Sequence, residues 1–125
     1  MKQNSDKWLE HLASTHWMDH VSRILDSAVE IARIVKEQKS SVLIHCSDGW
    51  DCTAQLTSLA ELLLDPYYRT RIGFQQLIEK EWCSFGHKFR DRTAHGASNH
   101  SNEYSPIFLQ WVDCVWQVVV RYVAL

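Results

Sequence analysis

The stretch 42–56 constrains the fold of this chain more than any other. It opens with a short apolar run that ends in His-Cys, continues as a polar turn with one glycine, and passes into apolar residues at helical spacing. This order predicts a strand over 41–45, a tight loop, and a helix over 53–64 that an Asp-Pro pair ends. The loop would lie at the N-terminus of that helix, where free backbone N–H groups and the positive dipole end bind anions such as phosphate.

Cys46 closes the predicted strand and would face the helix N-terminus. A positive electrostatic environment lowers the pKa of a thiol and increases its thiolate fraction, and the thiolate is the nucleophilic form. Taken in isolation, a cysteine is more often a small buried apolar residue. In this setting the pattern favours a cysteine nucleophile beneath a phosphate-binding loop.

Helices are expected on both sides of the loop. Apolar residues at steps of three and four predict a long helix over 8–35, another over 73–82, and a last one after the Ser-Pro pair at 105–106. The apolar stripe of the first helix comprises Trp17, Val21, Ile24, Ala28, Ile31 and Val35. Because one strand cannot form a sheet by itself, the predicted strand would need neighbours from outside this chain.

The composition narrows the functional classes. The chain of 125 residues suits one domain or a part of one, and its formal net charge of −2 provides no basic field for nucleic acid. No apolar run is long enough for a transmembrane helix, and the polar first residues do not resemble a signal peptide. The four cysteines are not spaced as a disulfide framework, which indicates a reducing, cytosolic setting. Of these, Cys83 and Cys114 are expected in the core.

Neither a metal nor a cofactor is expected. His45, Cys46 and Cys52 carry ligand-type side chains, but structural zinc sites favour closely spaced cysteines, usually in two pairs. Redox chemistry is an alternative for the two thiols, since oxidation could link Cys46 to Cys52 and lock the loop.

The segment H-C-S-D-G-W-D-x-T-A-Q resembles the signature of the myotubularin family, cysteine-dependent phosphatases that remove the 3-phosphate from phosphoinositides. Three further segments are similar to this family and lie in its order: L-D-P-Y-Y-R-T, G-F-Q-x-L-I-E-K-E-W-x-S-F-G-H-K-F-x-x-R and S-P-I-F-L-Q-W-V-D-C-V-W-Q. The resemblance covers residues 8–118, with divergent ends at 1–7 and 119–125. It implies an α/β fold: the C-terminal part of a cysteine-phosphatase-like domain, with strand, phosphate loop and helix surrounded by other helices.

The resemblance also implies roles for individual residues. Cys46 would be the nucleophile and Asp51 the general acid, although Asp51 is equally well placed to be the N-cap of the helix. The residues that would bind the substrate are Ser47, Asp48, Gly49, Trp50, Lys88 and Arg92. For Trp50 the alternative is plain packing, and for Lys88 and Arg92 it is a solvated helix end.

Cys52 departs from the family pattern, because active members have arginine at this position. A guanidinium binds two phosphate oxygens at once and stabilises charge on the transferring phosphoryl group, which a cysteine cannot do. Loss of one oxyanion donor costs ~10²–10³ in kcat. The expected function is therefore a phosphatase segment for phosphatidylinositol 3-phosphate or 3,5-bisphosphate that acts through phosphocysteine and is impaired at position 52.

An inactive pseudophosphatase is the alternative function. Such a module would bind phosphoinositide or act as an adaptor paired with an active relative. The partners expected from the resemblance are a phosphoinositide head group at a membrane surface and, in an oligomer, a second copy or a related phosphatase. The expected location is the cytoplasm, at the periphery of endosomal membranes. A third alternative is a segment that does not fold independently.

Overall fold

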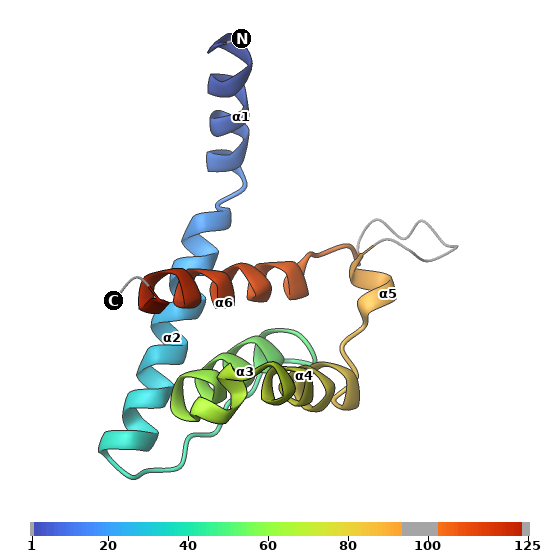
Figure 1. Ribbon diagram of the computed structural model, residues 1–125. Coiled ribbons are helices and arrows are strands. Elements are labelled where there is room, and N and C mark those ends of the chain that lie inside the picture. The colour runs from blue at the N-terminus through green and yellow to red at the C-terminus, as the bar shows by residue number, and fades with distance from the viewer. Residues whose placement is uncertain (1, 94–102, 124–125) are drawn as a thin grey trace.

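The computed structural model describes residues 2–93 and 103–123 (Figure 1). The regular structure of these ranges is helical, and its elements in chain order are α1 (Lys2–Ser14), α2 (Trp17–Glu37), α3 (Cys52–Leu64), η1 (Pro66–Arg69), α4 (Arg71–Ile78), η2 (Glu79–Ser84), α5 (Phe89–Arg92) and α6 (Ile107–Val123). η1 is a 3-10 helix and η2 a π-helix. Within the described ranges, no helix combines the length and apolar character needed to cross a membrane.

The long helix predicted over 8–35 is in fact two helices, so the prediction of one continuous helix is wrong. His16 lies in the left-handed region with φ 55°, and the Thr15 hydroxyl donates to the Leu12 carbonyl at 2.7 Å. A side chain that hydrogen-bonds to a nearby carbonyl gives the backbone an alternative to the helix. As a result α1 stands away from the other helices (Figure 1).

The core lies where α2, α3, η2 and α6 meet. Its buried side chains include Val21, Ala28, Leu59, Leu62, Leu77, Trp82, Trp111 and Cys114. The rings of Trp82 and Trp111 are 5.2 Å apart, and Trp17 Nε1 donates to Asp113 Oδ2 at 2.6 Å, which ties α2 to α6. The predicted stripe of α2 is confirmed in its middle, whereas Val35 at its end is 36% exposed.

The helices that follow the loop agree with prediction in position. α3 ends at the Asp-Pro pair, where Asp65 Oδ1 accepts a hydrogen bond from Tyr67 N at 2.8 Å. The helix predicted over 73–82 begins as α4 and continues as η2, which carries Trp82 into the core. Cys83 is exposed, so its prediction as a core residue is wrong: it follows Trp82 by one position and therefore points away from the core face. Cys114 is buried as predicted.

The strand predicted over 41–45 is not formed in the described part of the chain, and the α/β class is therefore not confirmed. Residues 39–46 carry no regular structure. Their burial still alternates, since Val42 and Ile44 are half-buried while Leu43 between them is 87% exposed. A strand exists only through ladder hydrogen bonds to a neighbour, so this segment keeps the side-chain period of a strand without being one.

Candidate active site

The Cys46 thiol lies at the N-terminal end of α3 and accepts two hydrogen bonds. Thr53 Oγ1 and the backbone N–H of Gly49 each lie 3.1 Å from Cys46 Sγ. These contacts lower the pKa of the Cys46 thiol, with the Thr53 hydroxyl as the largest cause; partial burial opposes the shift, and the backbone N–H groups of Gly49, Asp48 and Thr53 support it. The expected lowering of this pKa is confirmed, although sequence reasoning did not single out Thr53.

Gly49 gives the loop its turn. Its φ is 87°, in the left-handed region where a side chain is strained, and a Cβ placed there would meet no atom within 4 Å. The residue is therefore required for its backbone conformation and not for space. This conformation directs its N–H at the Cys46 sulfur.

Asp51 occupies the N-cap position of α3, but its side chain makes no capping hydrogen bond. One carboxylate oxygen, Oδ2, accepts from Arg92 Nη2 at 2.8 Å and from Arg92 Nε at 3.1 Å. The other, Oδ1, lies 3.0 Å from His87 Nδ1. The Asp51 side chain therefore does not cap α3, and the first backbone N–H groups of α3 receive no hydrogen bond from it.

Arg92 is brought to the loop as predicted, but its donors already have acceptors within the chain. Besides the hydrogen bonds from Nε and Nη2 to Asp51, its Nη1 donates to the Glu103 carbonyl at 3.0 Å and lies 3.6 Å from Glu103 Oε2. The ion pair raises the pKa of Arg92, with the Asp51 hydrogen bond as the largest cause. In this conformation each nitrogen of the guanidinium already donates to an oxygen of the chain, so Arg92 connects Asp51 to Glu103.

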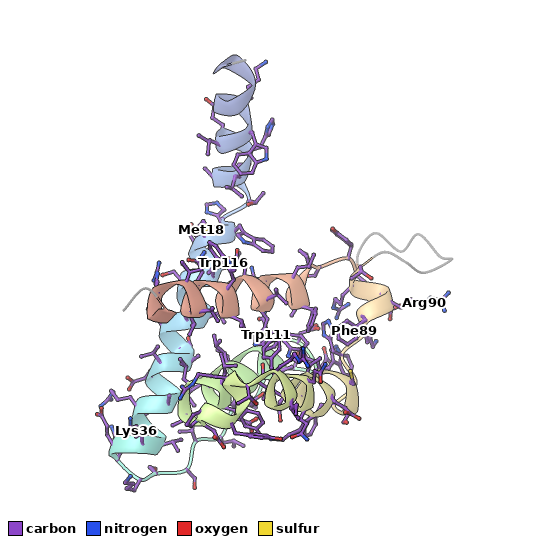
Figure 2. The ribbon with its side chains drawn as sticks, in the orientation of Figure 1. Met18, Lys36, Phe89, Arg90, Trp111 and Trp116 are labelled. Carbon is purple, nitrogen blue, oxygen red and sulfur yellow. The ribbon has the colours of Figure 1, made fainter. Side chains whose placement is uncertain are left out.

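Lys88 is also placed beside the loop. Its ammonium lies 4.7 Å from the centre of the Trp50 ring, in the geometry of a cation–π contact. The Lys88 side chain is exposed, so its positive charge is available at the surface next to the loop. Arg90, two residues after Lys88, instead points away from the molecule (Figure 2).

Ser47 and Asp48 are exposed on the outer side of the loop, where Ser47 Oγ donates to Asp48 Oδ2 at 3.3 Å. Cys52 is the first residue of α3 and is exposed overall. The pKa of its thiol is raised, first by local desolvation and then by the negative charges of Cys46 and Asp51. Position 52 therefore contributes a neutral thiol at the start of α3 at neutral pH.

All four cysteines are free thiols in the structure. Oxidative linkage of Cys46 and Cys52 thus stays a prediction. Burial raises the pKa of the Cys114 thiol to about 12, which makes it unreactive at neutral pH.

His87, like Thr53, is a site residue that sequence reasoning missed. It is buried, and its Nδ1 lies 2.8 Å from the carbonyl oxygen of Trp50. The one available signal was its position directly before Lys88, in a segment that already supplied two predicted site residues.

A separate cavity of about 690 Å³ lies between α3, α4 and α6. Its lining is mostly apolar and includes Leu62, Leu63, Phe74, Val115 and Val118, with Arg69 and Arg71 beside them. No residue of the loop lines it, so it is not part of the candidate active site.

Comparison with known proteins finds similarity over most of the chain. A family model described as "Myotubularin-like phosphatase domain" matches residues 1–124. The chain is 59% identical to myotubularin of Xenopus laevis over 112 residues, which is 89% of the chain and 19% of that protein. It is 54% identical to myotubularin of Rattus norvegicus over 116 residues, or 92% of the chain and 19% of that protein.

A third relative carries an activity in its name. The chain is 57% identical over 116 residues to a protein of Mus musculus named phosphatidylinositol-3,5-bisphosphate 3-phosphatase MTMR2, covering 92% of the chain and 18% of that protein. The chain thus spans about a fifth of the length of these relatives.

Proposed function

The chain belongs to the myotubularin-like phosphatase family, and we propose that its loop is the phosphate-binding site of a phosphoinositide 3-phosphatase domain whose turnover is impaired at Cys52. One observation carries this proposal: the Cys46 thiol accepts hydrogen bonds from Thr53 Oγ1 and Gly49 N–H at the start of α3. A thiol so placed is both an activated nucleophile and a neighbour of the backbone donors that bind phosphate oxygens.

The substrate class follows from charge and from the relatives. Lys88 adds a positive charge at the rim of the loop. This charge suits the phosphate groups of an inositol phosphate or bisphosphate head group. The name of the mouse relative supports phosphatidylinositol 3,5-bisphosphate, and phosphatidylinositol 3-phosphate is the simpler member of that class. The proposed location is the cytoplasmic surface of endosomal membranes.

The proposed reaction has two steps. The Cys46 thiolate attacks phosphorus in line, so that an S–P bond forms while the bond from phosphorus to the inositol oxygen breaks, and Asp51 protonates that oxygen as it leaves. Water then attacks phosphorus of the phosphocysteine and gives a proton to the Asp51 carboxylate while the S–P bond breaks, which releases inorganic phosphate and restores the Cys46 thiolate and the Asp51 acid. Since Asp51 Oδ2 is paired with Arg92 in the present geometry, the acid role requires this ion pair to loosen when substrate binds.

Turnover is expected to be weak because the loop lacks its arginine. The neutral Cys52 thiol cannot bind two phosphate oxygens or compensate their charge. Arg92 does not replace it, because its donors are directed to Asp51 and Glu103.

A second candidate function is binding without turnover, as an adaptor paired with an active relative. Exposed apolar side chains favour it. Trp116 and Leu109 on α6 are 57% and 59% exposed, and Met18 at the start of α2 is 51% exposed. Such side chains suit a protein partner better than water.

The test is phosphate release from vesicles that contain phosphatidylinositol 3-phosphate or 3,5-bisphosphate. The chain, Cys52→Arg and the double variant Cys52→Arg/Cys46→Ser are compared. Phosphate release by Cys52→Arg alone, abolished by Cys46→Ser, supports an impaired phosphatase. If the unmodified chain matches Cys52→Arg, the claim of impairment is wrong.

If none of the variants releases phosphate, vesicle binding decides between the two functions. Binding that depends on the inositol phosphate supports the adaptor, and absence of binding by a chain that melts cooperatively contradicts both.

A further inference from the structure

His87 is a buried, titratable side chain for which the proposed reaction has no role. Its side chain is 1% exposed, and one nitrogen, Nδ1, faces two oxygens of the loop. These are the Trp50 carbonyl at 2.8 Å and Asp51 Oδ1 at 3.0 Å. Because a carbonyl oxygen only accepts, Nδ1 must carry the hydrogen, which sets the tautomer of the ring.

Aromatic side chains hold the imidazole in this orientation. The Trp82 and Phe89 rings lie 4.8 and 4.7 Å from it, both nearly perpendicular to its plane. The backbone N–H of His87 donates to the Trp82 carbonyl at 3.0 Å. The ring is thus fixed to the core through Trp82, and its Nδ1–H is a donor of defined position.

The segment 87–92 contacts the loop at three places. His87 binds the Trp50 carbonyl, Lys88 lies over the Trp50 ring, and Arg92 binds the Asp51 carboxylate, with its shorter hydrogen bonds on Oδ2 and a longer one of 3.4 Å on Oδ1. The Trp50 carbonyl belongs to the second peptide group after the one that carries the Gly49 N–H. Because peptide groups are planar, a fixed Trp50 carbonyl limits how the loop backbone between them can rotate, and this backbone directs the Gly49 N–H at Cys46 Sγ.

We propose that His87 is a positioning residue: its Nδ1–H holds the Trp50 carbonyl and the Asp51 carboxylate, and thereby keeps the loop in the conformation that activates Cys46. The catalytic importance of this positioning rests on the proposed function. Its test, however, uses the reactivity of the Cys46 thiol and needs no phosphate turnover.

Two substitutions separate positioning from packing. Asparagine offers an N–H donor close to the place of Nδ1 but lacks the ring, so His87→Asn preserves the hydrogen bond and loses aromatic contact. Phenylalanine keeps an aromatic ring but has no donor, so His87→Phe does the reverse. If His87 acts by packing alone, Cys46 in His87→Phe should react as it does in the unmodified chain. If His87 acts by positioning, Cys46 in His87→Asn should react as it does in the unmodified chain.

The measurement is the rate at which iodoacetamide alkylates Cys46 as a function of pH, read by peptide mass spectrometry so that the other cysteines do not interfere. We expect His87→Phe to slow alkylation of Cys46 at neutral pH roughly tenfold, as loss of a hydrogen bond to a charged group would. His87→Asn should stay within about threefold of the unmodified chain, about 0.65 kcal/mol at 298 K. Equal rates in all three proteins, or a normal rate in His87→Phe with a slow one in His87→Asn, overturn the proposal.

A measurement on the unmodified chain covers the case in which a variant does not fold. Long-range ¹H–¹⁵N correlation spectra report which imidazole nitrogen carries hydrogen. The proposal requires a protonated Nδ1 in His87, and a neutral ring protonated on Nε2 alone would overturn it. If Cys52→Arg proves inactive while the alkylation pattern holds, the proposed function fails and the positioning role of His87 stands.

Discussion

Arg92 donates two hydrogen bonds to one oxygen of the Asp51 carboxylate, from Nη2 at 2.8 Å and from Nε at 3.1 Å, across 41 positions of the sequence. The side chains are only 14% and 20% exposed, so the pair is shielded from water. This contact joins α5 to the start of α3, and it determines which groups of the site remain free for a ligand.

The pair should contribute to stability. Because Arg92→Ala would leave the Asp51 carboxylate partly buried with only His87 beside it, we expect it to lower the free energy of unfolding by about 2 kcal/mol. Arg90→Ala is the matched control on the same helix: Arg90 points into solvent (Figure 2), and its loss should cost at most about 0.5 kcal/mol. Urea unfolding measures both, and equal costs would contradict the assigned role of Arg92.

The cysteines should react in an order that exposure alone does not predict. Cys46 has a lowered pKa and Cys52 a raised one, although Cys52 is the more exposed of the two. At neutral pH iodoacetamide should therefore alkylate Cys46 before Cys52, and Cys114 last. Peptide mapping after timed quenching measures this order. Faster alkylation of Cys52 than of Cys46 at neutral pH would show that the loop does not activate its thiol.

Thr53 should control the Cys46 pKa more than any other side chain. Thr53→Val removes the hydroxyl that donates to Cys46 Sγ and should move the midpoint of Cys46 alkylation to higher pH by about one unit. Thr53→Ser retains the hydroxyl and should leave the midpoint nearly unchanged. A shared midpoint for the two variants would assign the lowered pKa to the backbone N–H groups instead.

The Cys46 thiol should make the free energy of unfolding increase with pH. Its pKa in the folded chain lies below the ordinary value of 9.0, so its stabilising contribution is complete above pH 9. That contribution is lost as the pH falls through the lowered pKa. Urea unfolding between pH 6 and 9 should thus show a smaller gain of stability with pH in Cys46→Ser than in the unmodified chain. Parallel curves would contradict the shift.

Two glycines should respond differently to alanine. At Gly49 the cost is backbone strain at φ 87° without any clash, so we expect Gly49→Ala to lose about 1 kcal/mol and to slow Cys46 alkylation. At Gly73 a new Cβ would collide with the backbone carbonyl of Tyr67, so Gly73→Ala should cost more, without a specific effect on Cys46. Thermal unfolding ranks the two costs, and the reverse order would contradict this assignment.

Local sequence was sufficient for several features of the fold. The helix α3 was predictable because apolar spacing, a turn glycine before it and an Asp-Pro pair after it all act within a few residues. The start of α6 followed from Ser105-Pro106 in the same way. The break at His16 was not predictable from spacing, since Leu9, Ala13 and Trp17 keep the helical step of four across it.

The strand predicted over 41–45 is a feature that local sequence was not sufficient to determine. Its alternating burial is a local property and is present, but a strand also needs a partner that lies elsewhere. In the part of the chain that the structure describes, no segment provides this partner. The class of the fold therefore could not follow from the residues of the segment itself.

The chemistry of the loop also depends partly on local sequence and partly on tertiary contacts. The lowered pKa of its Cys46 thiol, its turn glycine and its place before a helix follow from residues 46–53, because backbone conformation and the helix N-terminus are determined over such short distances. The roles of Asp51, His87 and Arg92 depend on contacts between segments about forty positions apart, which exist only because Trp82 and Phe89 pack η2 and α5 beside the loop. Packing of this kind is a property of the whole core, so no local pattern in the sequence records it.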